Sequence, residues 1–111
     1  MDLELKVYAG ANFRRDIRWR PEGVPLDLTT WSAILRAAPQ RGQAASFDLT
    51  SPSDGLTLSA DGIITIAMDA EQTEALPGPA LFYVLDMRSP DGEVSRVLRG
   101  RLVVVRDVLV E

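Results

Sequence analysis

The stretch from residue 80 to residue 105 constrains the fold more than any other part of the chain. Two apolar runs, residues 80–88 and 93–105, flank the segment Ser-Pro-Asp-Gly at residues 89–92. Proline presets the backbone for the first corner of a turn, and glycine supplies the positive φ that a tight reversal requires. Two apolar runs joined in this way are typical of an antiparallel β-hairpin. The sequence therefore predicts a long hairpin over Ala80–Val105.

Alternation along this hairpin assigns its side chains to two faces, because residues two apart in a strand share a face. Tyr83, Leu85, Met87, Leu98, Leu102 and Val104 are expected to lie in the core, and the return strand also carries Val94, Arg96 and Gly100 on the face of Leu98. The opposite face carries Phe82, Val84, Val97, Arg99, Arg101 and Val103. This second face has more apolar surface than a solvated face needs. We expect it to be covered, either by the chain's own segment Val108–Val110 or by a partner subunit.

Two details of the return strand carry further expectations. Gly100 inside a strand predicts a bulge or a close approach of another backbone segment. Arg99 and Arg101 are expected to pair across the hairpin with Asp86 or Glu93, and such exposed ion pairs stabilise a fold by only about 0–1 kcal/mol.

The rest of the chain also favours short strands. Alternating or short apolar runs bounded by turn residues predict strands at residues 3–8, 12–20, 31–37, 45–49, 56–58 and 63–68. Residues 24–29 can form at most a short edge strand, because Pro25 cannot donate to a ladder. Residues 31–37 also contain good helix formers, but we favour a strand because the run is short and Pro39 closes it. Arg15 interrupts the alternation of its strand and is expected near an edge, with its head group in water.

One helical turn or two is expected at residues 69–76. Asp69 suits an N-cap, and Gln72 stands three residues later, as in a capping box. The segment Pro-Gly-Pro at residues 77–79 ends the helix.

These elements predict the fold class. Seven to nine short strands, at spacings of roughly 8–15 residues and with turn signals between them, are typical of an all-β, antiparallel, immunoglobulin-like sandwich. The chain of 111 residues, 46% hydrophobic and 25% charged, is long enough for one core and too short for two ordinary domains. We expect a single domain over residues 1–111.

Composition argues against several function classes. The chain has no cysteine and no histidine, which removes thiol nucleophiles, Cys-based metal sites and the commonest general base. The net charge of −4 argues against a nucleic-acid partner. No run is long and apolar enough to span a membrane, and the first residues have no signal-peptide pattern. We therefore expect neither an enzyme nor a cofactor, and synthesis in a cytoplasm without secretion.

Three groups of residues could have either a binding function or a purely structural role. Asp54, Asp61 and Asp69 could bind calcium, but turn and capping roles are favoured. The strand with Arg14, Arg15, Arg18, Arg20 and Trp19 could bind nucleic acid, but a charged edge strand or a docking site for an acidic protein is favoured. Trp19, Trp31 and Tyr83 could form a sugar-binding platform, but the core of a small sandwich needs its aromatics.

Several segments carry a family resemblance. They are residues 8–13 (Tyr-Ala-Gly-Ala-Asn-Phe), 25–33 (Pro-Leu-Asp-Leu-Thr-Thr-Trp-Ser-Ala), 61–66 (Asp-Gly-Ile-Ile-Thr-Ile), 71–76, 89–92 and 98–104. With this pattern the chain resembles the small β-sandwich proteins of tailed bacteriophages and prophages. These are similar to the N-terminal domain of upper baseplate proteins, which attach receptor-binding parts to the tail. The chain departs from the family pattern after Gly10, where Ala11 and Asn12 replace Asp-Thr, and at Thr30, which replaces Gly.

The resemblance implies a virion structural protein of the tail tip, baseplate or neck, made in the host bacterium and in contact with other phage structural proteins or further copies of itself. It offers no functional residues to carry over. The candidate interface, taken from the arginine-rich strand at residues 12–20 and from the hairpin face opposite the core, is Arg14, Arg18, Arg20, Phe82, Val84, Val97, Arg99, Arg101 and Val103. The alternatives are a head-decoration protein and a carbohydrate-binding module, and the latter needs two aromatics exposed on one concave face.

Overall fold

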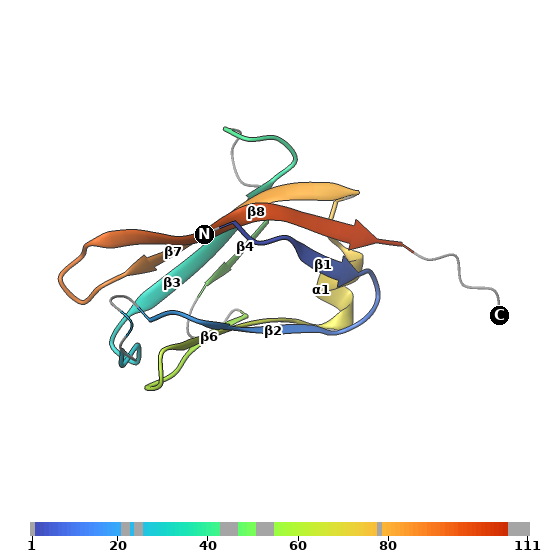
Figure 1. Cartoon of the computed structure of the whole chain (residues 1–111). Coiled ribbons are helices and arrows are strands. Elements are labelled where there is room, and N and C mark those ends of the chain that lie inside the picture. Colours follow the sequence, from blue (N-terminus) through green and yellow to red (C-terminus); the bar gives the residue numbers. More distant parts are fainter. Residues whose placement is uncertain are drawn as a thin grey trace.

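A computed structural model describes residues 2–20, 23, 26–42, 47–50, 55–77 and 79–106. Over these ranges the chain forms eight strands and one short helix, arranged as two layers (Figure 1). In chain order they are β1 (Leu5–Tyr8), β2 (Phe13–Arg18), β3 (Ser32–Ala38), β4 (Phe47–Thr50), β5 (Leu56–Leu58), β6 (Ile63–Met68), α1 (Ala70–Glu74), β7 (Ala80–Arg88) and β8 (Val94–Val105).

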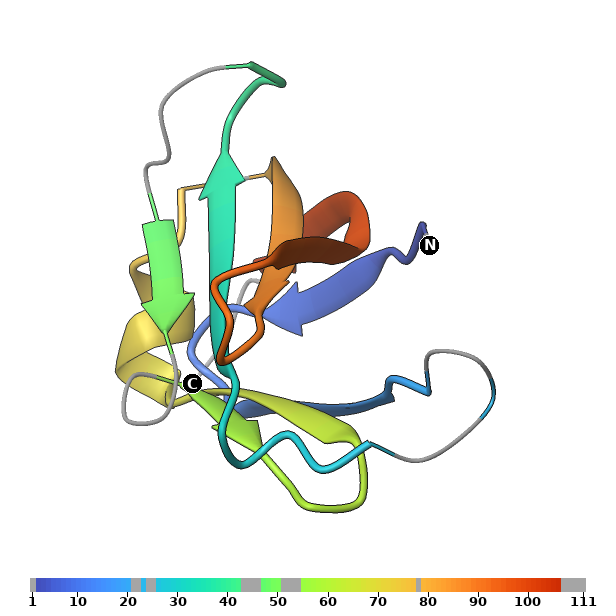
Figure 2. The same ribbon diagram turned by 90° about the vertical axis from the view of Figure 1, so that its left-hand side faces the viewer.

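The strands form two sheets, which confirms the all-β sandwich. The larger sheet has the order β1-β8-β7-β3-β4, and the smaller has the order β2-β6-β5. Figure 2 shows the smaller sheet lying beneath the larger one. This is the immunoglobulin arrangement, in which strands B, E and D share one sheet and G, F, C and C′ the other. One pairing departs from the expected antiparallel sandwich, because β1 runs parallel to β8.

The predicted hairpin is confirmed as the centre of the larger sheet. β7 and β8 pair from Ala80↔Val103 to Arg88↔Val94. The turn between them closes through two backbone hydrogen bonds, in which Ser89 N–H donates to Glu93 O at 2.8 Å and Gly92 N–H donates to Ser89 O at 2.9 Å.

A β-bulge in this hairpin corrects the predicted faces. Leu85 lies opposite Leu98, but the next residue, Asp86, lies opposite Arg96, so Val97 is the extra residue. Because a one-residue shift exchanges the faces of a strand, Val94 and Arg96 lie on the outer face, and their predicted place on the same face as Leu98 was wrong. Val97 is 7% exposed and belongs to the core cluster, so its predicted place on the outer face was also wrong.

Gly100 confirms the predicted close backbone approach. A Cβ atom added there would lie 2.3 Å from the carbonyl oxygen of Leu3. Tyr83 lies directly opposite Gly100 on β7, and its hydroxyl donates to the same Leu3 carbonyl at 2.5 Å. The Leu3 N–H in turn donates to Arg99 O at 3.0 Å. The missing side chain thus makes room for the N-terminal segment that leads into β1.

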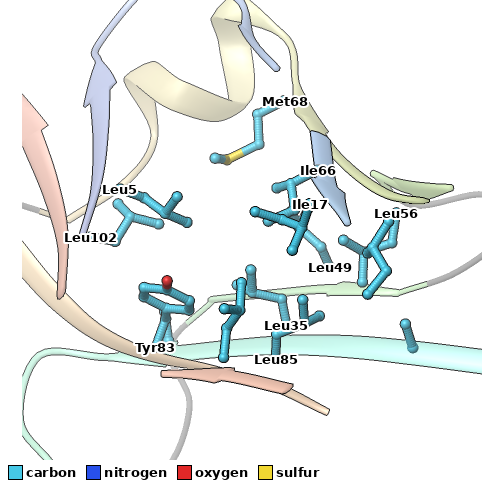
Figure 3. Packing of buried hydrophobic residues seen from close by; sticks show 14 of the residues in the cluster. Leu5, Ile17, Leu35, Leu49, Leu56, Ile66, Met68, Tyr83, Leu85 and Leu102 are labelled. Atoms are coloured by element: carbon cyan, nitrogen blue, oxygen red, sulfur yellow. The ribbon is translucent and has the colours of Figure 1, made fainter. Parts of the chain in front are cut away.

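The core fills the space between the sheets and draws on both. Figure 3 shows Leu5, Leu35, Leu85 and Leu102 of the larger sheet facing residues of the smaller sheet. The expected inward side chains of β6, namely Ile64, Ile66 and Met68, are buried. The cluster also includes Leu28, from the segment before β3.

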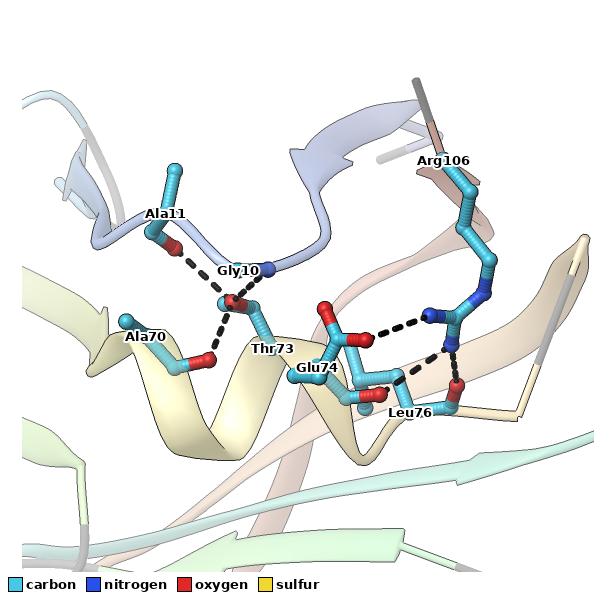
Figure 4. Close-up of polar contacts among 7 residues, drawn as sticks. All are labelled: Gly10, Ala11, Ala70, Thr73, Glu74, Leu76 and Arg106. Carbon is cyan, nitrogen blue, oxygen red and sulfur yellow. Dashed lines mark hydrogen bonds and ion pairs between the residues drawn. The ribbon is translucent and has the colours of Figure 1, made fainter. Parts of the chain in front are cut away.

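The helix closes one end of the sandwich through its polar contacts. Asp69 and Gln72 form the predicted capping box. The buried Thr73 hydroxyl accepts from Gly10 N–H at 3.1 Å and donates to Ala11 O at 2.8 Å, which ties the helix to the β1–β2 turn (Figure 4). At the other end, the Arg106 guanidinium donates to the carbonyl oxygens of Glu74 and Leu76. A cation at this position suits the carbonyls at a helix C-terminus.

Other predictions are confirmed, although the bounds of the strands differ by one or more residues. Residues 32–38 form a strand and no helix. Arg15 is exposed on β2, an edge strand of the smaller sheet. Residues 26–31 contain no strand. Residues 24–25, 45–46, 54 and 108–110 lie outside the described residues, so the predictions made for them stay predictions.

Burial of Tyr83, which is 2% exposed, raises the pKa of its phenol to about 12 from an ordinary value near 10. Since the unfolded chain then releases this proton first, the stability due to the neutral phenol is complete below pH 10. It is lost between about pH 10 and pH 12, by at most about 2–3 kcal/mol. We expect Tyr83→Phe to lower the free energy of unfolding by about 1 kcal/mol at pH 7, because the hydrogen bond is lost. Above pH 10 the free energy of unfolding of this variant should fall less steeply than that of the wild type.

Urea unfolding monitored by tryptophan fluorescence from pH 7 to pH 11.5 measures both effects. Tyr8→Phe is the matched control, because Tyr8 is exposed. If the free energy of unfolding fell equally above pH 10 in the wild type and in Tyr83→Phe, the loss of stability at alkaline pH would not be due to Tyr83.

Candidate functional site: the outer face of the larger sheet

The outward side chains of β3, β7 and β8 form the face that we call the outer face. They lie in four rows across the sheet, set by the strand register: Ser32–Arg88–Val94, Ile34–Asp86–Arg96, Arg36–Val84–Arg99 and Ala38–Phe82–Arg101. Val84 thus lies between two arginines, and Phe82 lies beside a third. Four of the predicted interface residues lie in these rows (Phe82, Val84, Arg99 and Arg101), and Val103 continues the face along β8.

Arg96 forms an ion pair with two hydrogen bonds on this face. Its guanidinium donates two hydrogen bonds to Asp86, from Nε to Oδ1 at 2.9 Å and from Nη2 to Oδ2 at 3.2 Å. The Asp86 side chain is 12% exposed and that of Arg96 is 58% exposed. Hydrogen bonds and the charge of Asp86 raise the pKa of the Arg96 guanidinium. The bulge at Val97 creates this pair, because it places Arg96 opposite Asp86.

The predicted pairing of Arg99 and Arg101 with Asp86 or Glu93 was wrong. Arg99 pairs with Asp2 at 3.0 Å, and Arg101 lies 3.5 Å from Glu4. The reason is the parallel docking of the N-terminal segment on β8, which brings these two carboxylates beside the arginines. Both pairs are exposed to solvent and therefore contribute little to stability.

A hollow of about 560 Å³ lies on the outer face, beside the loop that follows β3. Phe82, Val84 and Gly100 contribute to its lining, and so do four arginines: Arg36, Arg41, Arg96 and Arg99. The Arg41 guanidinium lies over the Phe82 ring, 4.8 Å from the ring centre, a favourable cation–π geometry. No carboxylate is among the described residues that line the hollow.

The arginines of β2 do not join this surface. Arg14 and Arg18 lie on β2 in the smaller sheet, and Arg20 follows that strand, so the candidate interface is divided between the two sheets. Arg14 lies 3.7 Å from Asp16 on its own strand, as expected of an ordinary solvated face.

The aromatic side chains do not form a sugar-binding platform in the described part of the chain. Tyr83 is buried, and Trp19 and Trp31 are half-buried and pack edge to face, with ring centres 5.2 Å apart. Of the large apolar side chains that the structure describes, Tyr8 and Val94 are exposed. The requirement for two exposed aromatics on one concave face is not met by these residues.

The acidic residues also have structural positions. Asp69 caps the helix, and Asp61 accompanies Gly62 in the β5–β6 turn. The described residues contain no group of three metal-ligating side chains. Nor do they include a helix with the length and apolar character needed to cross a membrane.

The sequence prediction missed Arg36 and Arg41 as members of this site. The outward position of Arg36 follows from the alternation of Ala33, Leu35 and Ala37 into the core, so this signal was available. Arg41 lies in the loop after β3, where no periodicity applies.

A scan against models of known protein families found no match, and a search of curated proteins found none either.

Two of the ion pairs of β8, Arg96–Asp86 and Arg99–Asp2, should differ in their contribution to stability. Arg96→Ala leaves a mostly buried carboxylate without its partner, and we expect it to cost about 1–2 kcal/mol, because water at the exposed guanidinium already screens part of the interaction. Arg99→Ala is the matched control, since its pair is 61% and 76% exposed, and it should cost about 0–1 kcal/mol. Urea unfolding at pH 7 measures both values. Equal losses would contradict the special position of Asp86.

Proposed function

We propose that the protein is a virion structural protein of a tailed bacteriophage or prophage, placed at the tail tip, baseplate or neck. Its resemblance to the small β-sandwich proteins of tailed phages, carried by segments across the chain, supports this role. The single structural observation that supports an assembly function is the outer face, where the half-buried Val84 lies between Arg36 and Arg99 and the half-buried Phe82 lies beside Arg101.

The composition of this face suits a protein interface. Aromatic residues and arginines are enriched at such interfaces, and they contribute most of the binding energy where they are desolvated. β7 and β3 are interior strands, with backbone partners on both sides. They hold Val84, Phe82 and Arg36 on a rigid surface, so a partner would dock on side chains whose positions are already set. Such preorganisation lowers the entropic cost of binding.

A head-decoration protein would use the same kind of surface and remains the nearest alternative. A carbohydrate-binding module has less support, because Trp19 and Trp31 pack against each other and Tyr83 is buried.

The test of the proposed function is the protein content of purified particles. We expect mass spectrometry of gradient-purified virions, from the phage or induced prophage that encodes the chain, to detect this protein in a fixed ratio to the tail proteins. Tailless heads purified from the same lysate are the control, and they separate a tail position from head decoration. Absence from intact particles would contradict the proposal.

A further inference from the structure

A second hollow extends the site along β3 and β7. It measures about 320 Å³, and its lining includes Ile34, Arg88 and Val94. Both hollows are lined by Arg36, so they are neighbours on the outer face. We call the two together the basic track. It follows β3 from Ser32 to Ala38, a length of roughly 20 Å at the rise of a β-strand.

The charge of the basic track is opposite to that of the chain as a whole. The net charge of the protein is −4. The track, however, is lined by one carboxylate, Asp86, and by five arginines: Arg36, Arg41, Arg88, Arg96 and Arg99.

Three of these arginines are available for a partner. Asp86 already holds Arg96, and Asp2 holds Arg99. Arg36, Arg41 and Arg88 form no ion pair with any residue that the structure describes.

The track also has apolar positions between its cations. Val84 lies between Arg36 and Arg99 in one row, and Phe82 lies one row away with Arg41 over its ring. Val94, at the far end, is an exposed apolar side chain. A matching ligand therefore carries carboxylates spaced along its length, with apolar groups between them.

We propose that the basic track binds an extended acidic segment of a partner protein, about six residues long by the strand rise. This inference rests on the proposed function, in that it takes the outer face as the assembly surface, and it adds the chemistry of the partner. Arginine binds carboxylates through two parallel hydrogen bonds, which gives both charge and direction. The recognition uses side chains and not strand addition, because β3 and β7 have no free backbone edge.

A protein segment fits the track better than a nucleic acid does. Single-stranded nucleic acids bind through aromatic rings on which bases stack. Of the two aromatic residues that line the track, Tyr83 is buried, and the Arg41 guanidinium lies over the Phe82 ring. The acidic balance of the whole chain also opposes a polyanion much longer than the track.

The experiment uses the full chain and a fluorescein-labelled hexapeptide, Glu-Leu-Glu-Ser-Glu-Leu, in fluorescence anisotropy. The same peptide with Gln in place of each Glu is the ligand control. The test variant is Arg36→Glu with Arg41→Glu, and its matched control is Arg14→Glu with Arg18→Glu, which changes the net charge equally but on the smaller sheet. Circular dichroism checks that both variants fold, and amide NMR shifts of the wild-type protein locate the peptide.

We expect the acidic peptide to bind, and we expect its affinity to fall with added salt. Binding should shift the amide NMR signals of β3, β7 and β8. The test variant should bind at least about tenfold more weakly, whereas the control variant should change by less than about twofold. Equal weakening in both variants, shifts confined to β2, or no binding at about 1 mM peptide would overturn the inference.

Two further outcomes would also overturn it. One is tighter binding of a single-stranded oligonucleotide on the same face. The other is a shift of the track amides on deletion of residues 107–111, which would assign the face to the chain's own C-terminal segment. Failure of peptide binding with the protein present in virions would reject this inference alone. Peptide binding with the protein absent from virions would reject the proposed function alone.

Discussion

The larger sheet depends on the contact between the Leu3 backbone and the bare Cα of Gly100. An added Cβ would lie 2.3 Å from the Leu3 carbonyl oxygen, so the segment can lie there only because residue 100 has no side chain. Tyr83, opposite Gly100, completes the contact with its hydrogen bond to the same oxygen. This junction sets the parallel register of β1 on β8 and brings Leu5 and Val7 into the core. A small sandwich has little surface to bury. The absence of a side chain at Gly100 allows this sheet to include β1 as its fifth strand.

The same junction shapes the charge of the outer face. It places Asp2 and Glu4 beside Arg99 and Arg101 and so neutralises the β8 side of the sheet. The bulge at Val97 has a second effect, because it pairs Arg96 with Asp86 at the centre of the face. The outer-face arginines that form no ion pair with a described residue are Arg36 on β3, Arg41 in the loop after it and Arg88 at the end of β7. The proposed interface role of this face and its proposed acidic partner both rest on this distribution of charges.

Local sequence signals predicted much of this fold, and long-range register accounts for what they missed. The Ser89–Gly92 turn, the Asp69 capping box and the strand alternation act over a few residues, so they could be recognised directly. The bulge at Val97 could not, since alternation carries no sign of a one-residue shift, and the faces of β8 before the bulge are exchanged. The sequence correctly predicted that Phe82, Val84, Arg99 and Arg101 share one face. It did not predict the carboxylates that pair with the two arginines. Those partners come from a segment almost the whole chain away, whose parallel pairing has no signature in sequence.

The most direct test of this account is the stability of Gly100→Ala, measured by urea unfolding together with amide hydrogen exchange. Alanine ordinarily stabilises a strand position relative to glycine by about 0.4–1 kcal/mol. Here the added methyl group collides with the Leu3 carbonyl, so the substitution should instead lower the free energy of unfolding by about 1–3 kcal/mol. The amides of β1 should lose protection before those of β3 and β7. A variant as stable as the wild type, with β1 still protected, would contradict the central role of this junction.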